Sequence, residues 1–246
     1  MKHKTLAVLC AVVLTAGMMT GCGQKTEDTK TESGSEKTVS DEMAEKAGFS
    51  DGTGEEVSDK EEASDAKDTK EAVLDTSKEL TGIHHAQINV KDYGEIQVEL
   101  DADTAPVTVT NFVKLAQEGF YDGLTFHRIM DGFMVQGGDP LGNGTGGSDE
   151  NIKGEFSNNG VENNISHTRG VISMARAMDD PDSASSQFFI VHEDSTFLDG
   201  DYAGFGHVTE GMDVVDAICK DAKPTDDNGT IKPEEQPVIE SITIVD

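Results

Sequence analysis

The sequence of 246 residues has few cysteines, few basic residues and no long hydrophobic run. Its three cysteines, at positions 10, 22 and 219, exclude a disulfide framework and a cysteine-rich zinc site. Lysine and arginine number 19 against 48 aspartate and glutamate residues, so the formal net charge is −29. This acidic balance argues against nucleic-acid backbones and anionic lipid surfaces as electrostatic partners.

The apolar stretch near the N-terminus, Leu6–Met19, has 14 residues, fewer than the roughly 20 that cross a bilayer as a helix. It follows a basic start, which is typical of a secretory signal rather than of a permanent span. The next residues, Met19-Thr20-Gly21-Cys22, resemble the bacterial lipobox, although Met19 stands where leucine is usual. We therefore expect residues 1–21 to be a lipoprotein signal peptide and Cys22 to be lipidated, which would anchor the chain at the cell membrane with its domain on the extracytoplasmic side. The alternative is an ordinary secreted protein in which Cys22 is an incidental thiol.

Residues 23–82 contain 18 acidic and 8 basic residues and hardly any large apolar residue. Such a stretch buries too little apolar surface to offset the entropy lost on ordering. We expect residues 22–82 to form a lipidated N-terminus and a disordered acidic linker that holds the domain away from the membrane. An acidic interaction tail is the alternative.

From Ile83 onward, short alternating runs separated by glycine predict β-strands. Two other stretches predict helices: Pro106–Glu118, with Asp103 or Thr104 as its cap, and Met212–Lys220. Many short strands, two helices and no alternation of strand with helix indicate a mainly-β antiparallel barrel with helices closing its ends. The predicted strands are Gly94–Leu100, Thr125–Met130, Phe133–Gln136, Val171–Ala175, Gln187–Val191, Gly204–Val208 and Val238–Val245.

Five short blocks in this domain point to one family. They are Phe126–Ile129, Gly132–Asp139, Ser173–Arg176, Ser185–Ile190 and Phe197–Gly200. In their order and spacing they resemble the signature of the cyclophilins, which are peptidyl-prolyl cis-trans isomerases. The resemblance covers about residues 84–246 and implies a closed eight-stranded antiparallel barrel capped by two α-helices. We therefore expect an isomerase domain at residues 83–246.

The reaction that this resemblance implies needs no nucleophile, metal ion or proton transfer. Rotation about an X–Pro bond has a barrier of about 18–20 kcal/mol because the amide resonance must be lost. A catalyst therefore needs an apolar slot for the proline ring and donors that favour the twisted amide over the planar one. Arginine suits the second task because it is a rigid donor that stays charged. We expect no cofactor, and proline-containing polypeptides as substrates.

The resemblance also assigns the site residues. It makes Arg128 the catalytic residue, although an arginine in so acidic a chain could instead be a structural ion-pair partner. It implies a proline pocket formed by Phe133, Met134, Phe189 and Leu198. Gln136 and Gln187 would orient Arg128 and the substrate backbone, and the backbone of Ala175 and Arg176 would bind the residue before proline. Phe197 and Tyr202 complete the substrate-binding residues.

Strand alternation supports this placement on its own terms. Side chains in a strand point to opposite faces in turn. Arg128 therefore faces away from His127 and Ile129. By the same period, Gln187 and Phe189 line a groove while Phe188 and Ile190 belong to the core.

Three of these positions depart from the best-known eukaryotic cyclophilins. Phe197 stands where tryptophan is usual, Tyr202 where histidine is common, and Arg176 where asparagine is frequent. The departures resemble bacterial cyclophilins, so we expect normal turnover. The absent indole N–H predicts weaker binding of the family's cyclic-peptide inhibitor, because an acceptor on that ligand would be buried without a donor.

Other functions are open to this sequence. The histidines show no HExxH or comparable ligand spacing, so the sequence predicts no metal site. A proline-peptide binding module or chaperone could use the same groove without catalysis, and an acidic surface adhesin would place the function in residues 23–82. The domain alone carries 30 acidic and 9 basic residues, and the resulting self-repulsion favours a monomer.

Overall fold

The computed structural model describes residues 71–246. The predicted signal peptide, Cys22 and most of the predicted linker lie outside these described residues. Over the described range, no helix has the length and apolar character needed to cross a membrane.

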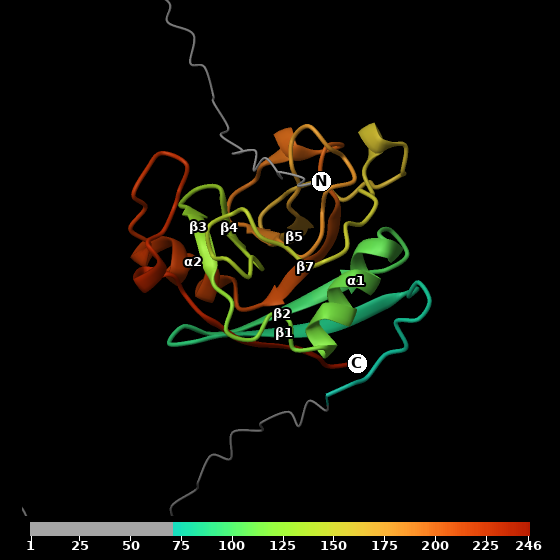
Figure 1. Ribbon diagram of the computed structural model, residues 1–246, viewed down its shortest axis with the longest axis horizontal. Helices are drawn as coiled ribbons and strands as arrows, with labels where there is room; N and C mark the ends of the chain where they lie inside the picture. Colours follow the sequence, from blue (N-terminus) through green and yellow to red (C-terminus); the bar gives the residue numbers. More distant parts are fainter. Residues whose placement is uncertain (1–70) are drawn as a thin grey trace, which may run out of the picture. The chain divides into compact units, whose positions relative to one another are not determined.

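Eight strands form one antiparallel sheet in the order β3-β4-β6-β5-β7-β2-β1-β8. The sheet curls, and Figure 1 shows the two helices well separated along it. Helix α1 packs against β8 and β2, and helix α2 packs against β2 and β4. The elements are β1 Ile83–Val90, β2 Gly94–Asp101, α1 Pro106–Gln117, β3 Phe126–Met130, β4 Met134–Gly137, β5 Val171–Met174, β6 Phe188–Val191, β7 Gly204–Glu210, α2 Met212–Asp221 and β8 Ile239–Ile244.

The sheet is open, so the expectation of a closed barrel is wrong. Strands β3 and β8 are its two edges, and residues 123–126 meet residues 237–239 in one isolated bridge, between Thr125 and Val238, with three backbone hydrogen bonds of 2.8–2.9 Å around it. The outer edge of β3 is instead covered by residues 229–231. The N–H of Ile129 donates to the first carbonyl of that segment at 2.8 Å, and the last N–H of the segment donates to the carbonyl of His127 at 3.0 Å. These bonds occupy the backbone groups that β8 would need to close a ladder, and they also protect the edge.

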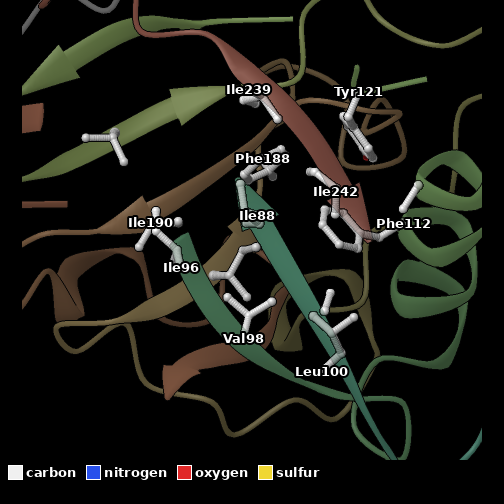
Figure 2. Packing of buried hydrophobic residues seen from close by; sticks show 14 of the residues in the cluster. Ile88, Ile96, Val98, Leu100, Phe112, Tyr121, Phe188, Ile190, Ile239 and Ile242 are labelled. Carbon is white, nitrogen blue, oxygen red and sulfur yellow. The ribbon is translucent and has the colours of Figure 1, made fainter. Parts of the chain in front are cut away.

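Alternate positions of the strands supply the core, as the period of two requires. Phe112 of α1 packs edge-on against Phe188 of β6, with ring centroids 5.5 Å apart. Each large apolar side chain buried in this way stabilises the fold by about 1.5–3 kcal/mol. Figure 2 shows how side chains from the curled sheet and from α1 converge, among them Ile88, Ile96, Val98, Leu100, Tyr121, Ile190, Ile239 and Ile242.

The start of α1 is capped differently from the sequence-based prediction. Neither Asp103 nor Thr104 caps the helix, and the N-cap is Ala105, without a side-chain bond. The buried carboxylate of Glu155 instead accepts the N–H groups of the second and third helical residues, at 3.0 and 2.8 Å. A carboxylate is favourable there because the N-terminal end of a helix carries partial positive charge.

The described part of the predicted linker, residues 71–82, lies against the domain. The N–H of Ala72 donates to the carbonyl of Ile244 at 2.8 Å, which extends the contacts of β8. The N–H of Leu80 donates to Thr110 on α1 at 2.8 Å. The side chains of Leu74 and Leu80 pack against the core.

His127 is a buried polar residue behind the outer face of β3. This residue is 4% exposed, and neither ring nitrogen has a hydrogen-bond partner among residues 71–246. Burial lowers the pKa of His127 from 6.5 to about 4, an effect that Arg128 reinforces and Asp139 opposes. The folded protein therefore holds this imidazole neutral over a pH range in which the unfolded chain binds a proton.

This burial predicts an acid-dependent loss of stability. Above pH 6.5 the imidazole is neutral in both states; as the pH falls from 6.5 to about 4, only the unfolded chain takes up the proton, which costs about 3 kcal/mol of stability. Urea unfolding at pH 7 and pH 4 should therefore show a smaller stability loss in His127→Leu than in the parent. The exposed His207→Gln should behave like the parent. Equal pH dependence in His127→Leu and the parent would contradict the assignment.

Candidate active site

Arg128 lies in the middle of β3 and is held from the neighbouring strand. It stands opposite Gln136 in the β3–β4 ladder, and its Nη1 donates to Gln136 Oε1 at 3.0 Å. Its Nε donates to the carbonyl of Asn228 at 2.7 Å. Cross-strand neighbours on one face of a sheet are close enough for such contacts, so the ladder register itself positions the guanidinium.

All acceptors of Arg128 are neutral. None of the ion pairs within residues 71–246 includes Arg128, so the structural ion-pair alternative finds no support there. Burial lowers the pKa of this guanidinium, while Tyr202 and Asp226 act to raise it, and arginine remains charged in proteins. In the described part of the chain, the one hydrogen-bond partner of its Nη2 is the thioether of Met130, at 3.2 Å, and sulfur is a weak acceptor. This N–H group therefore retains capacity for a stronger acceptor.

A chain of side-chain amides extends from Arg128 along the groove face. Gln136 Nε2 donates to Gln187 Oε1 at 2.9 Å, and Gln187 Nε2 donates to the carbonyl of Gly146 at 2.7 Å. Each amide is fixed at both ends, so the two glutamines have defined orientations. The structure thus brings together both residues that the resemblance assigns to orienting Arg128.

A second apolar cluster lies beside Arg128, separate from the main core. Phe188 and Ile190 point into the core with no exposed surface, as alternation predicts, whereas Phe189 between them belongs to this second cluster. The cluster consists of Met134, Val171, Phe189, Val191 and Leu198, with Met130, Phe133, Ile165, Ala175 and Tyr202 packed against it. Three of the four residues assigned to the proline pocket therefore belong to this cluster, and the fourth, Phe133, packs against it.

Phe133 connects the cluster to the guanidinium. The Cζ of Arg128 lies 5.7 Å from the centre of the Phe133 ring. Phe197 packs against the same ring with centroids 5.6 Å apart, and it remains 73% exposed. A charged donor and an apolar surface are thus adjacent, with an aromatic ring at the outer rim.

The side chain of Arg176 is used within the protein. Its guanidinium donates to the backbone carbonyls of Asp201, Ala177 and Met178 at 2.8–3.1 Å. It also stacks between two aromatic rings, at 5.1 Å from the centre of Phe156 and 4.9 Å from that of Tyr202. Arg176 therefore braces the wall that carries Tyr202.

The backbone of Ala175, beside Arg176, is partly committed as well. Its N–H donates to the carbonyl of Gln187 at 2.9 Å. The binding of the residue before proline by this backbone stays a prediction.

His167 lies beneath the second apolar cluster, a position that no sequence motif indicated. Its Nδ1 lies 2.9 Å from Asp199 Oδ1, its Nε2 lies 3.0 Å from Ser173 Oγ, and its ring stacks on Phe189. Burial lowers the pKa of His167 although Asp199 acts to raise it. Ser173 has no exposed surface, so this Asp–His–Ser arrangement cannot reach a substrate and instead supports Phe189. In the sequence, the residue that could have indicated a partner for His167 is Asp199, which directly follows Phe197-Leu198.

Comparison with known proteins agrees with this geometry. The family described as "Cyclophilin type peptidyl-prolyl cis-trans isomerase/CLD" matches residues 85–244. Peptidyl-prolyl cis-trans isomerase B of Bacillus subtilis is 49% identical over 124 residues, which covers 50% of this chain and 82% of that protein. A peptidyl-prolyl cis-trans isomerase of Helicobacter pylori is 48% identical over 127 residues, covering 51% and 74%.

Solved structures show the same fold. The crystal structure of a cyclophilin-type isomerase from Cryptosporidium parvum has a TM-score of 0.59 and 28% identity, covering 66% of this chain and 98% of that one. A second crystal structure of that protein, in the presence of the dipeptide Ala-Pro, has a TM-score of 0.58 and 29% identity, covering 65% and 98%. The chain therefore belongs to the family of cyclophilin-type peptidyl-prolyl cis-trans isomerases.

Proposed function

We propose that this isomerase works without a covalent intermediate, with Arg128 stabilising the twisted form of an X–Pro amide. The observation that carries the proposal is the position of the Arg128 guanidinium. It is held by neutral acceptors, it has a weakly engaged Nη2, and it lies next to the second apolar cluster. The Ala-Pro dipeptide used with the Cryptosporidium parvum protein supports proline-containing peptides as the ligand class.

The mechanism follows from what changes during rotation. A proline ring seated on Met134, Phe189 and Leu198 would place its nitrogen near Arg128. As the amide twists, resonance is lost and the nitrogen becomes pyramidal, so that its lone pair can accept a hydrogen bond. The planar ground state offers no such acceptor, and a donor at this position therefore favours the transition state selectively. Gln136 and the Asn228 carbonyl keep the donor in place, so little reorganisation is needed during rotation.

Replacement of Arg128 tests this mechanism directly. In a protease-coupled assay with a proline peptide, Arg128→Ala should lower kcat/KM by about 100-fold or more, the usual cost of removing a transition-state donor. Lys220→Ala, an exposed basic residue on α2, should retain parental turnover. Unchanged turnover in Arg128→Ala would overturn the mechanism, and rescue of a deletion phenotype by an inactive Arg128 variant would favour the binding module or chaperone.

The aromatic residue at the rim predicts a separation of inhibitor binding from catalysis. Phe197 offers no N–H, so Phe197→Trp should tighten binding of the family's cyclic-peptide inhibitor by about tenfold, the value of one restored hydrogen bond. The kcat/KM for a short proline peptide should stay near that of the parent. Inhibitor titration of both proteins measures the difference, and nanomolar inhibition of the parent would contradict the prediction.

We also propose that the chain is a bacterial lipoprotein whose domain acts outside the cytoplasm. Support comes from the basic start, the 14-residue apolar stretch and the Met19-Thr20-Gly21-Cys22 sequence. Newly translocated proteins whose X–Pro bonds isomerise over tens of seconds are suitable substrates there. Residues 22–82 would serve as the tether, and the strongly acidic domain would act as a monomer.

Substitution of Cys22 tests the anchor. In cells fed a palmitate analogue, the parent should carry the label and sediment with membranes, because the acylated cysteine is the mature N-terminus. Cys22→Ser should lose both the label and the membrane association, whereas Cys10→Ser should keep them. Label that persists in Cys22→Ser would refute the lipobox assignment.

A further inference from the structure

Three side chains that can bind metal ions meet behind the β3–β4 hairpin, outside the Arg128 groove. Asp131 lies in the turn after β3, His192 directly follows β6, and Cys219 lies on α2. One possible ligand atom of each lies within 4.8 Å of those of the other two. His192 and Cys219 are buried, at 8% and 4% exposure, while Asp131 is exposed. Figure 1 shows α2 beside the hairpin, which is how the helix reaches it.

The imidazole of His192 is oriented by a fourth residue. Asp216 lies three positions before Cys219, so both side chains lie on one face of α2. Asp216 Oδ1 is 3.0 Å from His192 Nε2, which places the ring proton on Nε2 and leaves the lone pair on Nδ1. That Nδ1 is 3.5 Å from Asp131 Oδ1. A carboxylate that fixes the far nitrogen of a histidine is the usual support of a metal-binding histidine.

We propose that Asp131, His192 Nδ1 and the sulfur of Cys219 bind a divalent cation of the zinc class, with one coordination position open to solvent. The ligands are one oxygen, one nitrogen and one sulfur, a set that suits tetrahedral zinc and disfavours magnesium and calcium. Ligand atoms around zinc lie about 3.5 Å apart, so the cluster needs to contract by roughly 1 Å at its widest separation. The exposed Asp131 gives access from solvent.

The charges around the cluster agree with a divalent ion. Asp131, Asp216 and a thiolate at Cys219 would supply three negative charges, of which Arg169 balances one through two bonds to Asp216, at 2.7 and 2.9 Å. A divalent cation would balance the other two. Without it, burial raises the pKa of Cys219 to about 12, an effect that Asp131 and Asp216 reinforce and Arg169 opposes. Metal binding therefore replaces the S–H bond by a metal–sulfur bond and releases one proton to solvent.

The site is connected to the turn that carries Phe133. The N–H of Gly132 donates to His192 Nδ1 at 3.0 Å, and the N–H of His192 donates to the carbonyl of Phe133 at 2.8 Å. A metal ion bound to Nδ1 would replace the hydrogen bond from the Gly132 N–H. The turn would then be held by the bond between the metal and Asp131 instead. Residues 131–133 therefore contact both the proposed metal site, through Asp131, and the second apolar cluster, through Phe133.

Cobalt provides a direct measurement, because Co²⁺ bound to a thiolate absorbs strongly in the near ultraviolet. The full chain carrying Cys10→Ser and Cys22→Ser has Cys219 as its only thiol. Titration with Co²⁺ should give one ion per chain with a thiolate-to-cobalt band that Zn²⁺ abolishes. Adding Cys219→Ser should remove the band, Asp131→Asn should weaken binding at least tenfold, and Asp216→Asn should weaken it about tenfold through loss of the histidine orientation.

Matched controls separate this site from adventitious binding. Asp213→Asn, an exposed acid on the same helix, and His207→Gln, an exposed histidine on β7, should bind cobalt as the parent does. Circular dichroism verifies that each variant is folded, and the exposed Asp131 makes Asp131→Asn the decisive substitution. A parent without the thiolate band, or an Asp131→Asn variant with parental affinity, would overturn the proposal. The readout is independent of isomerase turnover, so it tests the metal site apart from the proposed mechanism.

Discussion

The hydrogen bond between Arg128 and Gln136 is the interaction on which the proposed chemistry depends. In a chain with a net charge of −29, a carboxylate would be the commonest partner of an arginine, and it would neutralise the charge that the reaction needs. Here the acceptors are an amide oxygen and a backbone carbonyl, which fix the guanidinium without neutralising it. The acidic residues of the domain make no ion pair with it within residues 71–246. The same two hydrogen bonds thus fix the position of the Arg128 guanidinium and leave its positive charge unpaired within residues 71–246.

The ladder around β4 explains how one short strand organises the site. Gln136 pairs with Arg128 on one side and with Phe189 on the other. Met134 lies two positions earlier and so shares the face of Gln136. Val135 between them is fully buried in the main core, as are Phe188 and Ile190 on β6. The packing that stabilises the sheet therefore fixes the register that places the donor beside the apolar cluster.

Local pattern was sufficient for much of this structure. Alternation predicted that Ile129 of β3 and Phe188 and Ile190 of β6 face the core, but not the register shift that also buries Phe126. The helix signals placed α1 and α2 within one residue of their observed ends. Contacts between distant segments carry no such periodic signal. The cap from Glu155, the covering of β3 by residues 229–231 and the stacking of His167 on Phe189 each join parts of the chain that no spacing relates. The resemblance named residues that lie together around Arg128, and their role in substrate binding stays a prediction; no sequence pattern indicated the neutral surroundings of Arg128.

Arg176 and Arg128 show how the same side chain serves two purposes within one site. The Nε and Nη1 of Arg176 donate to three backbone carbonyls, and its guanidinium lies over the rings of Phe156 and Tyr202. Within residues 71–246, the one hydrogen-bond partner of Arg128 Nη2 is the thioether of Met130. In the proposed mechanism Arg128 would donate to the twisting amide, whereas Arg176 holds the backbone carbonyls of Asp201, Ala177 and Met178 in place. The two arginines therefore differ in their surroundings: Arg176 stabilises the loop backbone beside Tyr202, whereas Arg128 is held in the β3–β4 ladder next to the second apolar cluster.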